Sequence, residues 1–359
     1  MTSIVEAHIN LNALQHNLVR VRQAAPNSKV LAVIKANAYG HGLLQVADGL
    51  NQADAFAVAR LPEAIQLRQA GVEKTIVVLE GFQESKDIAQ FAEHNLQPVI
   101  HHIFQLELLD QVALQKPIAV WLKVDSGMHR MGVAPGFVKQ YWQQLQANEY
   151  VAEVRLMTHL ASADDRRNEQ TQQQLATFDQ AIAGLEAETG IANSAGVLGW
   201  PQSQREWVRP GIMLYGVSPF VGGCGEEENL KSVMTLKSRL IAVNHFKQGD
   251  AIGYGASWVC PEDMPIGVVA CGYGDGYPRH AVPGTPVLVN GQRVPLVARV
   301  SMDTICVDLR ELPDAHVGDP VVLWGEDLQV EEVAEAAGTI PYELLCSVTS
   351  RVVFNYAAY

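Results

Sequence analysis

The chain has 359 residues, of which 48% are hydrophobic and 18% charged, and its 39 acidic and 26 basic side chains give a net charge of -13. A chain of this length is longer than most single hydrophobic cores, so two domains are expected. The acidic balance excludes binding to a nucleic-acid backbone as the main function, because proteins that bind phosphate backbones usually present a basic surface.

The cysteines and the N-terminal residues indicate the cellular compartment in which the protein is expected. The five cysteines are scattered, with no CxxC pair and no metal-ligand spacing, which predicts reduced thiols and no metal site. Residues Met1–Glu6 lack the basic and apolar regions of a signal peptide, and no stretch approaches the roughly 20 apolar residues of a membrane span. We therefore expect a cytoplasmic protein without a membrane partner.

From about residue 29 to residue 217, short apolar runs alternate with longer amphipathic segments such as 61–70 and 168–189. Eight apolar strands interleaved with helices predict an α/β fold, in which a parallel sheet closes into a (β/α)8 TIM-type barrel. Continuous apolar runs fit strands that are buried on both faces. An open doubly wound sheet is the alternative, but no GxGxxG follows an early strand. The expected strands are Val30–Ile34, Ala55–Ala59, Thr75–Leu79, Gln97–Ile100, Ile118–Val124, Val154–Leu160, Ile191–Ala195 and Gly211–Tyr215.

After about residue 230 the chain changes to short strand-like runs separated by Gly, Pro and Asp, which predicts a mostly β C-terminal domain. Asn290-Gly291 indicates a hairpin, and a helix is expected around Val330–Ala337. We place the boundary in 222–230 and expect domains 1–228 and 229–359; the first residues could pair with the second domain. The expected strands of this domain are Leu240–Val243, Val268–Ala270, Pro286–Val289, Thr304–Val307 and Val321–Leu323.

Lys35 is the first candidate for chemistry. A hydrophobic strand carries this lysine to its C-terminal end, and a loop punctuated by glycines follows. Desolvation lowers the pKa of such an amine and makes it nucleophilic, so a Schiff base to an aldehyde cofactor is the expected use. The alternative is a strand-end lysine that extends to solvent. The run VIKANAYGHG at 33–42 resembles the pyridoxal-5'-phosphate lysine motif of alanine racemases, and the resemblance extends along nearly the whole chain.

The resemblance implies how the barrel binds this cofactor. The segment VRPGIMLYG at 208–216 is similar to the one whose arginine, here Arg209, contacts the pyridine nitrogen. A guanidinium cannot accept a proton at neutral pH, so that nitrogen stays unprotonated, which disfavours transamination and points toward racemisation. His159 would hydrogen-bond this arginine. The residues implied at the cofactor phosphate are Tyr39, Asn193, Ser194, Gly211 and Ile212.

A second barrel segment concerns the substrate. The run KVDSGMHRMG at 123–132 resembles a family segment whose arginine, here Arg130, binds the substrate carboxylate and approaches the phenolic oxygen of the cofactor. In some members of the family the lysine that matches Lys123 is carbamylated and pairs with that arginine. Whether Lys123 is modified is left open by the sequence.

The C-terminal domain supplies the remaining matches. The run GDAIGYGAS at 249–257 resembles the stretch that carries the catalytic tyrosine, here Tyr254, which the family takes from the partner subunit of a homodimer. Lys35 and Tyr254 would be two bases on opposite faces of the substrate Cα. The runs GYGDG at 272–276 and RVSMD at 299–303 imply substrate contacts at Tyr273, Met302 and Asp303. Ser350 departs from a tyrosine that some members carry there, which leaves the packing around Tyr254 open.

The sequence thus predicts an alanine racemase that interconverts L- and D-alanine by two-base proton transfer through an external aldimine with pyridoxal 5'-phosphate. Three alternatives stay open: a racemase of another small amino acid such as serine, an amino-acid decarboxylase of the same fold type, and a single-barrel carrier of the cofactor. Arg209 disfavours the decarboxylase, which generally has an acidic residue at the pyridine nitrogen, and the C-terminal domain disfavours the carrier. The sequence does not distinguish supply of D-alanine as a cell-wall precursor from alanine catabolism.

Overall fold

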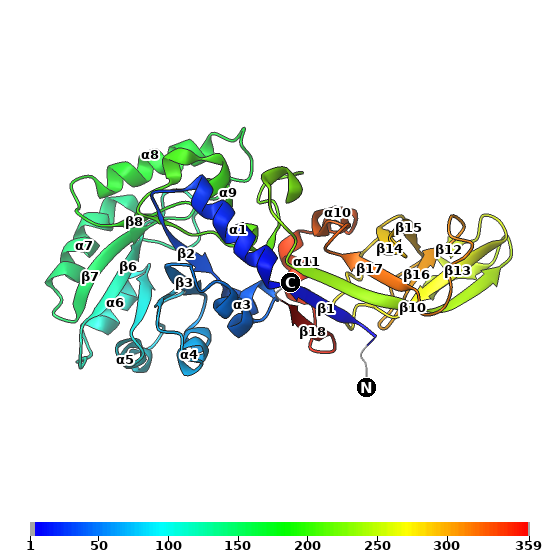
Figure 1. Cartoon of the computed structure of the whole chain (residues 1–359). Helices are drawn as coiled ribbons and strands as arrows, with labels where there is room; N and C mark the ends of the chain where they lie inside the picture. The colour runs from blue at the N-terminus through cyan, green and yellow to red at the C-terminus, as the bar shows by residue number, and fades with distance from the viewer. Residues whose placement is uncertain (1–3, 358–359) are drawn as a thin grey trace.

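The computed structural model describes residues 4–357, which form a barrel domain and an elongated, β-rich domain beside it (Figure 1). Residues 1–3, which belong to the segment tested above for a signal peptide, and residues 358–359 lie outside the described part. In Figure 1 the barrel, coloured blue to green, is at the left, and the β-rich domain, coloured yellow to red, extends to the right.

Eight parallel strands close into a barrel, which confirms the predicted α/β barrel. Each strand pairs with the next along the chain, and the last pairs with the first through Lys29 and Trp207. Most of their side chains are buried, as expected for strands covered on both faces, with β7 the most exposed of them. The strands are β2 (Lys29–Val33), β3 (Ala55–Val58), β4 (Thr75–Val78), β5 (Leu96–Ile100), β6 (Ile118–Lys123), β7 (Val151–Met157), β8 (Thr189–Gly190) and β9 (Trp207–Val208).

The seventh and eighth strands were predicted in the wrong place. They were expected at Ile191–Ala195 and Gly211–Tyr215, but β8 and β9 are two-residue strands that end before those runs begin. The run 212–215 forms a 3-10 helix, η3 (Ile212–Tyr215), whose four side chains are buried. A short apolar run reports burial and does not distinguish a strand from a buried helical turn. As a consequence, Arg209 directly follows β9 and lies at a strand end.

The helices surround the barrel and connect its strands (Figure 1). Asn10 caps α1 by accepting the N–H of Ala13 at 3.0 Å, and Leu14, Leu18 and Val21 form the buried face of this helix. The segment expected at 168–189 is helical only over 170–182. The helices are α1 (Leu11–Ala24), α2 (Lys35–Tyr39), α3 (Leu43–Gly49), α4 (Leu61–Gln69), α5 (Ser85–Glu93), α6 (Ile103–Leu109), α7 (Val138–Ala147), α8 (Gln170–Ile182) and α9 (Ser194–Gly199).

The C-terminal domain is built on an eight-stranded sheet in the order β13-β16-β15-β14-β17-β10-β1-β18. An additional pairing between β10 and β13 joins the two ends of a six-strand run. A further pair, β11 and β12, stands apart. The strands are β1 (Glu6–Asn10), β10 (Met234–Phe246), β11 (Ala251–Ile252), β12 (Trp258–Val259), β13 (Met264–Val269), β14 (Pro286–Val289), β15 (Gln292–Val297), β16 (Ile305–Asp308), β17 (Pro320–Trp324) and β18 (Val353–Ala357).

Local signals predicted two features of this domain correctly. Val289 pairs with Gln292 across Asn290 and Gly291, whose φ angles of 50° and 76° are those of a type I′ hairpin turn. The expected late helix is α10 (Val330–Ala336). Because β1 pairs with β10 and β18, the first described residues belong to the sheet of the C-terminal domain.

Two late helices connect the domains. α11 (Pro341–Ser347) returns from the C-terminal domain and packs against α2 of the barrel. Its Leu344 and Leu345 belong to the same continuous cluster of buried residues as the barrel core. Glu331 of α10 accepts the N–H groups of Ser218 and Gly225, each at 3.0 Å, in the segment that links the domains. The C-terminal domain is therefore placed to contribute residues to the end of the barrel where α2 lies, at the C-terminal ends of its strands.

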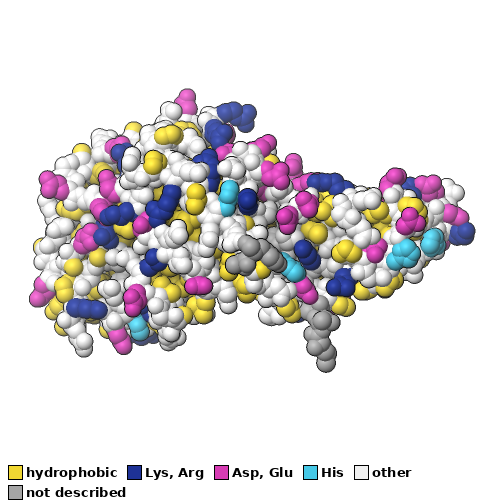
Figure 2. Space-filling view, viewed as in Figure 1, with side chains coloured by type: hydrophobic (Ala, Val, Ile, Leu, Met, Phe, Trp, Pro, Cys, Tyr) yellow, Lys and Arg dark blue, Asp and Glu magenta, His cyan; other side chains and the backbone are white. Residues whose placement is uncertain are grey.

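The surface and the helices bear on the expected partners. Acidic and basic side chains are interspersed over both domains on the face drawn in Figure 2, and basic side chains do not gather into a continuous patch there. Within residues 4–357 we find no helix that is both long enough and apolar enough to cross a membrane.

Candidate active site

A cavity of about 750 Å³ lies at the C-terminal ends of the barrel strands, where functional groups gather in this architecture. Its size is that of a small-molecule or cofactor site. The structure brings all ten of the predicted barrel residues together here. Those that line the cavity are Lys35, Tyr39, Lys123, Arg130, His159, Asn193, Ser194, Arg209, Gly211 and Ile212.

Lys35 follows β2 after one residue and reaches the cavity from the strand's C-terminal end. Burial lowers the pKa of its amine, and the positive charge of Arg130 lowers it further. The carboxylates of Glu80 and Glu63 act in the opposite direction. The net effect favours the neutral, nucleophilic form of the amine relative to an exposed lysine.

The turn that follows Lys35 is left-handed. Ala36, Asn37, Ala38 and Tyr39 have φ angles of 54°, 53°, 54° and 52°, although none of them is glycine. For L-residues this conformation costs about 1–2 kcal/mol each, so the surrounding structure must stabilise it. Backbone hydrogen bonds close the turn: the N–H groups of residues 38, 40 and 42 donate to the carbonyls of 34, 36 and 37 at 2.9–3.0 Å.

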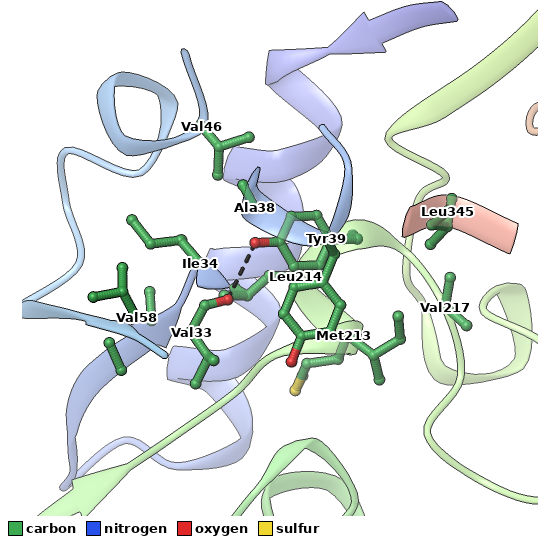
Figure 3. Packing of buried hydrophobic residues seen from close by; sticks show 14 of the residues in the cluster. Val33, Ile34, Ala38, Tyr39, Val46, Val58, Met213, Leu214, Val217 and Leu345 are labelled. Carbon is green, nitrogen blue, oxygen red and sulfur yellow. Dashed lines mark hydrogen bonds between the residues drawn. The ribbon is translucent and has the colours of Figure 1, made fainter. Parts of the chain in front are cut away.

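Two contacts hold this left-handed turn from within the fold. The buried ring of His41 donates from Nδ1 to the carbonyls of Ala38 (3.1 Å) and Tyr39 (2.9 Å). Burial lowers the pKa of His41 to about 4, so the ring is neutral and Nδ1 carries the proton. On the other side, Gly40 has a φ of 82° and packs against the backbone of Leu345 in α11: a Cβ at Gly40 would lie 2.0 Å from that carbonyl oxygen. In Figure 3, Leu345 lies on a ribbon segment separate from the one that carries Ala38 and Tyr39.

The turn directs Tyr39 into the cavity. Its ring stacks on Tyr215 with centroids 4.8 Å apart, and the Tyr215 hydroxyl donates to the carbonyl of Val33 at 3.1 Å. The Tyr39 hydroxyl lies against Gly211, where a Cβ would come within 2.5 Å of it, so only glycine fits at that position. Ser194 Oγ accepts the N–H of Gly211 at 2.9 Å. The hydroxyls of Tyr39 and Ser194 thus flank the backbone of Gly211, an arrangement suited to an anion.

Two further residues that were expected at this anion site, Asn193 and Ile212, line the same cavity. Ile212 is buried and lines the cavity. Asn193 caps α9 by accepting the N–H of Gly196 at 2.9 Å, so its side chain orders the strand-to-helix connection that carries Ser194. Because the N–H of Gly211 already donates to Ser194, the Ser194 hydroxyl fixes the position of this backbone segment.

Arg209 is 5% exposed and lies beside His159. Its guanidinium donates to the carbonyls of Gly190 and, at 2.5 Å, of Thr158. Nη2 lies 3.4 Å from His159 Nδ1. Burial lowers the pKa of Arg209 to about 10, which leaves it charged at neutral pH. Burial together with the charge of Arg209 holds the pKa of His159 well below its usual range, so His159 is neutral and accepts from the guanidinium.

Lys123 and Arg130 complete the positively charged side of the cavity. Burial, followed by the charges of Arg209, Arg130 and Lys35, lowers the pKa of Lys123 to about 8. An amine with this pKa is partly neutral at physiological pH and can react with an electrophile. Asp125 Oδ1 accepts three consecutive N–H groups, of residues 127, 128 and 129, at 2.9–3.1 Å. These bonds order the loop that carries Arg130.

The structure leaves four of the predicted residues outside this cavity, all on the C-terminal domain: Tyr254, Tyr273, Met302 and Asp303. The side chain of Tyr254 is 69% exposed and that of Met302 is 52% exposed. The N–H of Tyr273 donates to the carbonyl of residue 301 at 3.0 Å, and Asp303 accepts from Arg351 at 2.8 Å. These residues therefore form a surface of the C-terminal domain that a single chain does not bring to Lys35.

Sequence reasoning missed the contribution of α11. Ile340, Tyr342 and Cys346 line the cavity, and the Tyr342 ring lies 6.0 Å from that of Tyr39. Pro341 at the first position of this helix, followed by apolar residues, was an available helix signal. No local signal places the helix over the barrel. Ser350, whose effect was left open above, lies in an exposed turn and does not line the cavity.

Both domains of the chain match known protein families. Residues 9–219 match the family described as "Alanine racemase, N-terminal domain", and residues 233–356 match "Alanine racemase, C-terminal domain". The two matches together span nearly the whole chain, in the order that the predicted motifs require.

Individual relatives agree with these matches. A protein of Nitrosococcus oceani named alanine racemase is 56% identical over 348 residues, which cover 97% of this chain and 98% of that protein. The alanine racemase of Shewanella piezotolerans is 52% identical, with 98% and 99% covered. Among solved structures, the biosynthetic alanine racemase of Pseudomonas aeruginosa has a TM-score of 0.97 at 44% identity, covering 99% and 100% of the two chains. That of Bartonella henselae, described with covalently bound pyridoxal phosphate, has a TM-score of 0.90 at 29% identity, with 99% and 100% covered.

Proposed function

The chain belongs to the alanine racemase family, and from this premise we infer that it is an isomerase that interconverts L-alanine and D-alanine at the cavity around Lys35. The observation that carries this conclusion is the high identity to relatives of that name over nearly the full length of both chains. The buried Arg209 beside this cavity supports it independently, since an always-charged donor suits racemisation.

We propose pyridoxal 5'-phosphate as the cofactor, because the cavity offers a partner for each of its reactive parts. Lys35 has a lowered pKa and could bind the aldehyde carbon. The hydroxyls of Tyr39 and Ser194 beside Gly211 suit the phosphate. When bound, this cofactor supplies an electron-withdrawing ring that acidifies the Cα proton of an amino acid.

Arg209 would face the pyridine nitrogen. Its guanidinium donates to two backbone carbonyls and to His159, so the side chain is held in one orientation. The guanidinium has donors only and stays charged at neutral pH. It would therefore donate a hydrogen bond to the pyridine nitrogen without giving up its proton, and the nitrogen would stay unprotonated. Asn193 and Ile212 would complete the cofactor site by ordering the backbone around Ser194.

The two proposed bases are Lys35 and the Tyr254 of a second copy of the chain. One would remove the proton from one face of the substrate Cα, and the other would donate a proton to the opposite face, so that the substrate need not rotate between the two transfers. Within one chain Tyr254 is exposed and does not line the cavity. A homodimer with shared active sites is therefore part of the proposal, and it gives the exposed surface of Tyr254, Tyr273 and Met302 a partner.

For the substrate carboxylate we propose Arg130, with Tyr273, Met302 and Asp303 contributed by the second copy. The loop bonds of Asp125 hold Arg130 at the cavity. Lys123, with a pKa of about 8, is the candidate for carbamylation, which would convert a repulsive neighbour of Arg130 into an attractive one. A cytoplasmic location and a domain division at 228/229 remain our proposals.

The experiment that tests the function is the optical activity of L-alanine incubated with the purified, cofactor-loaded protein. Circular dichroism should decay to zero while the total alanine concentration, measured by chromatography, stays constant. Loss of alanine with formation of an amine and carbon dioxide would identify a decarboxylase instead. A constant signal with alanine, but decay with L-serine, would change the substrate and keep the reaction class.

A further inference from the structure

Glu63 joins the ends of two barrel strands next to Lys35. One oxygen of its carboxylate, Oε1, accepts the N–H of Ala36 at 2.7 Å. The other, Oε2, accepts the N–H groups of Ala59 at 2.9 Å and Arg60 at 3.1 Å. Ala36 is the residue after Lys35, and Ala59 directly follows β3. One carboxylate in the first turn of α4 therefore fixes the backbone at the ends of β2 and β3.

The bond to Ala36 lies where the chain needs an external anchor. Ala36 is the first residue of this turn with a positive φ, so the backbone enters the left-handed conformation between Lys35 and Ala36. The far end of the left-handed turn is held by His41. Of the side-chain hydrogen bonds within residues 4–357, the one to Glu63 holds the near end, next to the amine-bearing residue.

Glu63 also contributes charge to the surroundings of Lys35. Its carboxylate favours the protonated amine, as does Glu80 at the end of β4. Arg130 opposes them from the loop after β6, and Cys346 of α11 also faces the amine. The pKa of Lys123 in turn responds to Lys35. Glu63 is the one of these charged groups that also binds the backbone beside Lys35.

We propose that Glu63 is a positioning residue for Lys35: its carboxylate holds the start of the left-handed turn through the Ala36 N–H and so aims the lysine amine into the cavity. This inference rests on the proposed role of Lys35. It adds a residue that touches neither cofactor nor substrate and acts through the backbone and its charge.

The same fold contains a matched control for a simple helix cap. Glu63 is the third residue of α4 and accepts the N–H of Arg60, the N-cap residue; Asp87 is the third residue of α5 and accepts the N–H of Glu84, the N-cap residue there. Asp87 accepts only from its own segment, from the N–H groups of Gln83 and Glu84 at 3.4 and 3.3 Å. Removing either carboxylate weakens a helix start, but only Glu63 reaches the strand of Lys35.

The test compares three variants of the full-length holoenzyme: Glu63→Gln, Glu63→Asp and Asp87→Asn. Glutamine keeps the shape but has one acceptor oxygen and no charge, so it cannot accept all three N–H groups. Aspartate keeps the charge but is one methylene too short to reach Ala36 from the same helix. The measurements are the rate at which hydroxylamine releases the covalently bound cofactor, the pH profile of kcat, which reports the substrate complex in which the Lys35 amine is free, and the thermal unfolding midpoint.

We expect cofactor release to accelerate about tenfold or more in both Glu63 variants and to stay unchanged in Asp87→Asn. In Glu63→Gln the acidic limb of the pH profile should also move to lower pH, because the lost negative charge no longer favours protonated Lys35. Glu63→Asp should keep this limb in place. All three variants should unfold at a slightly lower temperature, because each weakens the hydrogen bond from the N-cap N–H to the carboxylate of the third helical residue.

Equal cofactor release and equal pH profiles in Glu63→Gln and Asp87→Asn would overturn the proposal and leave Glu63 as a helix cap. The release measurement needs no racemisation. If the wild-type protein binds the cofactor but racemises nothing, the proposed function fails while the role of Glu63 is still decided. If no cofactor attaches to the wild-type lysine, both fail together.

Discussion

At the residue scale, the chemistry of this protein depends on charged side chains that the barrel buries together. Lys35, Lys123, Arg130 and Arg209 line one cavity, and each lowers the proton affinity of its neighbours. Burial, together with these neighbouring charges, lowers the pKa values of Lys35 and Lys123 and keeps His159 neutral. Removing any one of these side chains should change both charge and contact, so variants must be compared with matched controls outside the cavity.

Lys35→Ala should abolish covalent attachment of the cofactor, the visible absorption that comes with it, and racemisation. The reason is that alanine has no amine to react with an aldehyde. Absorption spectra of the purified proteins and the circular dichroism of L-alanine measure the two effects. Lys29→Ala is the control, since Lys29 lies at the other end of β2 and pairs with Glu188 at 2.5 Å. A Lys35→Ala protein that kept its absorption and its turnover would show that the lysine is wrongly assigned.

His41 should make the protein sensitive to mild acid. Its pKa is about 4 in the folded chain, because of burial, and near 6.5 in an unfolded chain. Between these values only the unfolded chain binds the proton, so the free energy of unfolding should fall with pH by about 1.4 kcal/mol per unit from this group alone. Above pH 6.5 the contribution is constant, and below pH 4 the loss is complete.

Urea unfolding at several pH values between 7 and 4 measures this dependence. His41→Gln should show a shallower loss of stability with falling pH than the wild type, while the variant of an exposed histidine, His280→Gln, should follow the wild type. His159 also has a lowered pKa and remains in all three proteins, so the difference isolates His41. Parallel curves for wild type and His41→Gln would contradict the assignment.

At the scale of single elements, the left-handed turn after Lys35 is held by contacts that come from elsewhere in the chain. The backbone of residues 36–39 is in a conformation that alanine and tyrosine avoid. Contacts from His41, Glu63 and Leu345 hold it from three sides. The turn depends on the fold around it, and so does the direction of Tyr39.

Gly40→Ala should destabilise the protein well beyond the cost of a positive φ. The added methyl would strain the backbone and would also meet the Leu345 carbonyl at 2.0 Å. Gly71→Ala is the matched control: Gly71 has a φ of 85°, but nothing lies within 4 Å of its Cβ position. We expect a loss of about 1 kcal/mol for Gly71→Ala and at least about 3 kcal/mol for Gly40→Ala, measured by chemical unfolding. Similar losses of stability in the two variants would mean that α11 can move away from the added methyl group at little cost in free energy.

Local sequence patterns predict some secondary-structure elements correctly and others wrongly. The hairpin at Asn290-Gly291 was predicted correctly, because both residues adopt a positive φ readily and the turn needs no distant contact. The strand expected at Gly211–Tyr215 is a 3-10 helix. Its apolar residues are buried in either conformation, and the choice between them depends on how the barrel closes. Short buried segments therefore remain ambiguous without the tertiary structure.

At the scale of the whole molecule, one chain separates the proposed bases. Lys35 lies in the barrel cavity, whereas Tyr254 lies exposed on the C-terminal domain. The proposed dimer brings the Tyr254 of one copy to the Lys35 of the other. Each active site would then contain one base from each chain, which can be tested by mixing two inactive variants.

Lys35→Ala and Tyr254→Phe should each be nearly inactive alone, and refolding equal amounts of the two together should restore about one quarter of the wild-type activity. Half of the randomly assembled dimers are mixed, and in a mixed dimer one of the two sites has both bases intact. Racemisation of L-alanine by the refolded mixture measures this recovery. If both bases came from the same chain, every site would lack one of them and mixing would restore nothing.

The barrel, the β-rich second domain and the resemblance to the family all follow from the order of residues along the chain. These features rest on patterns that are local in the chain: alternating apolar runs, an Asn-Gly turn, and motifs such as VIKANAYGHG with Lys35 at a strand end. All ten predicted barrel residues meet in one cavity because parallel strands of a barrel end on the same face.

Four features could be found only from the folded chain: the left-handed turn, the short strands β8 and β9, and the approach of α11 and of Glu63 to that turn. The physical reason is the same in each case. These features depend on contacts between segments that are far apart in the chain, such as Gly40 with Leu345 and Glu63 with Ala36. Neither residue propensity nor hydrophobic period contains that information, because both describe a segment by its own residues.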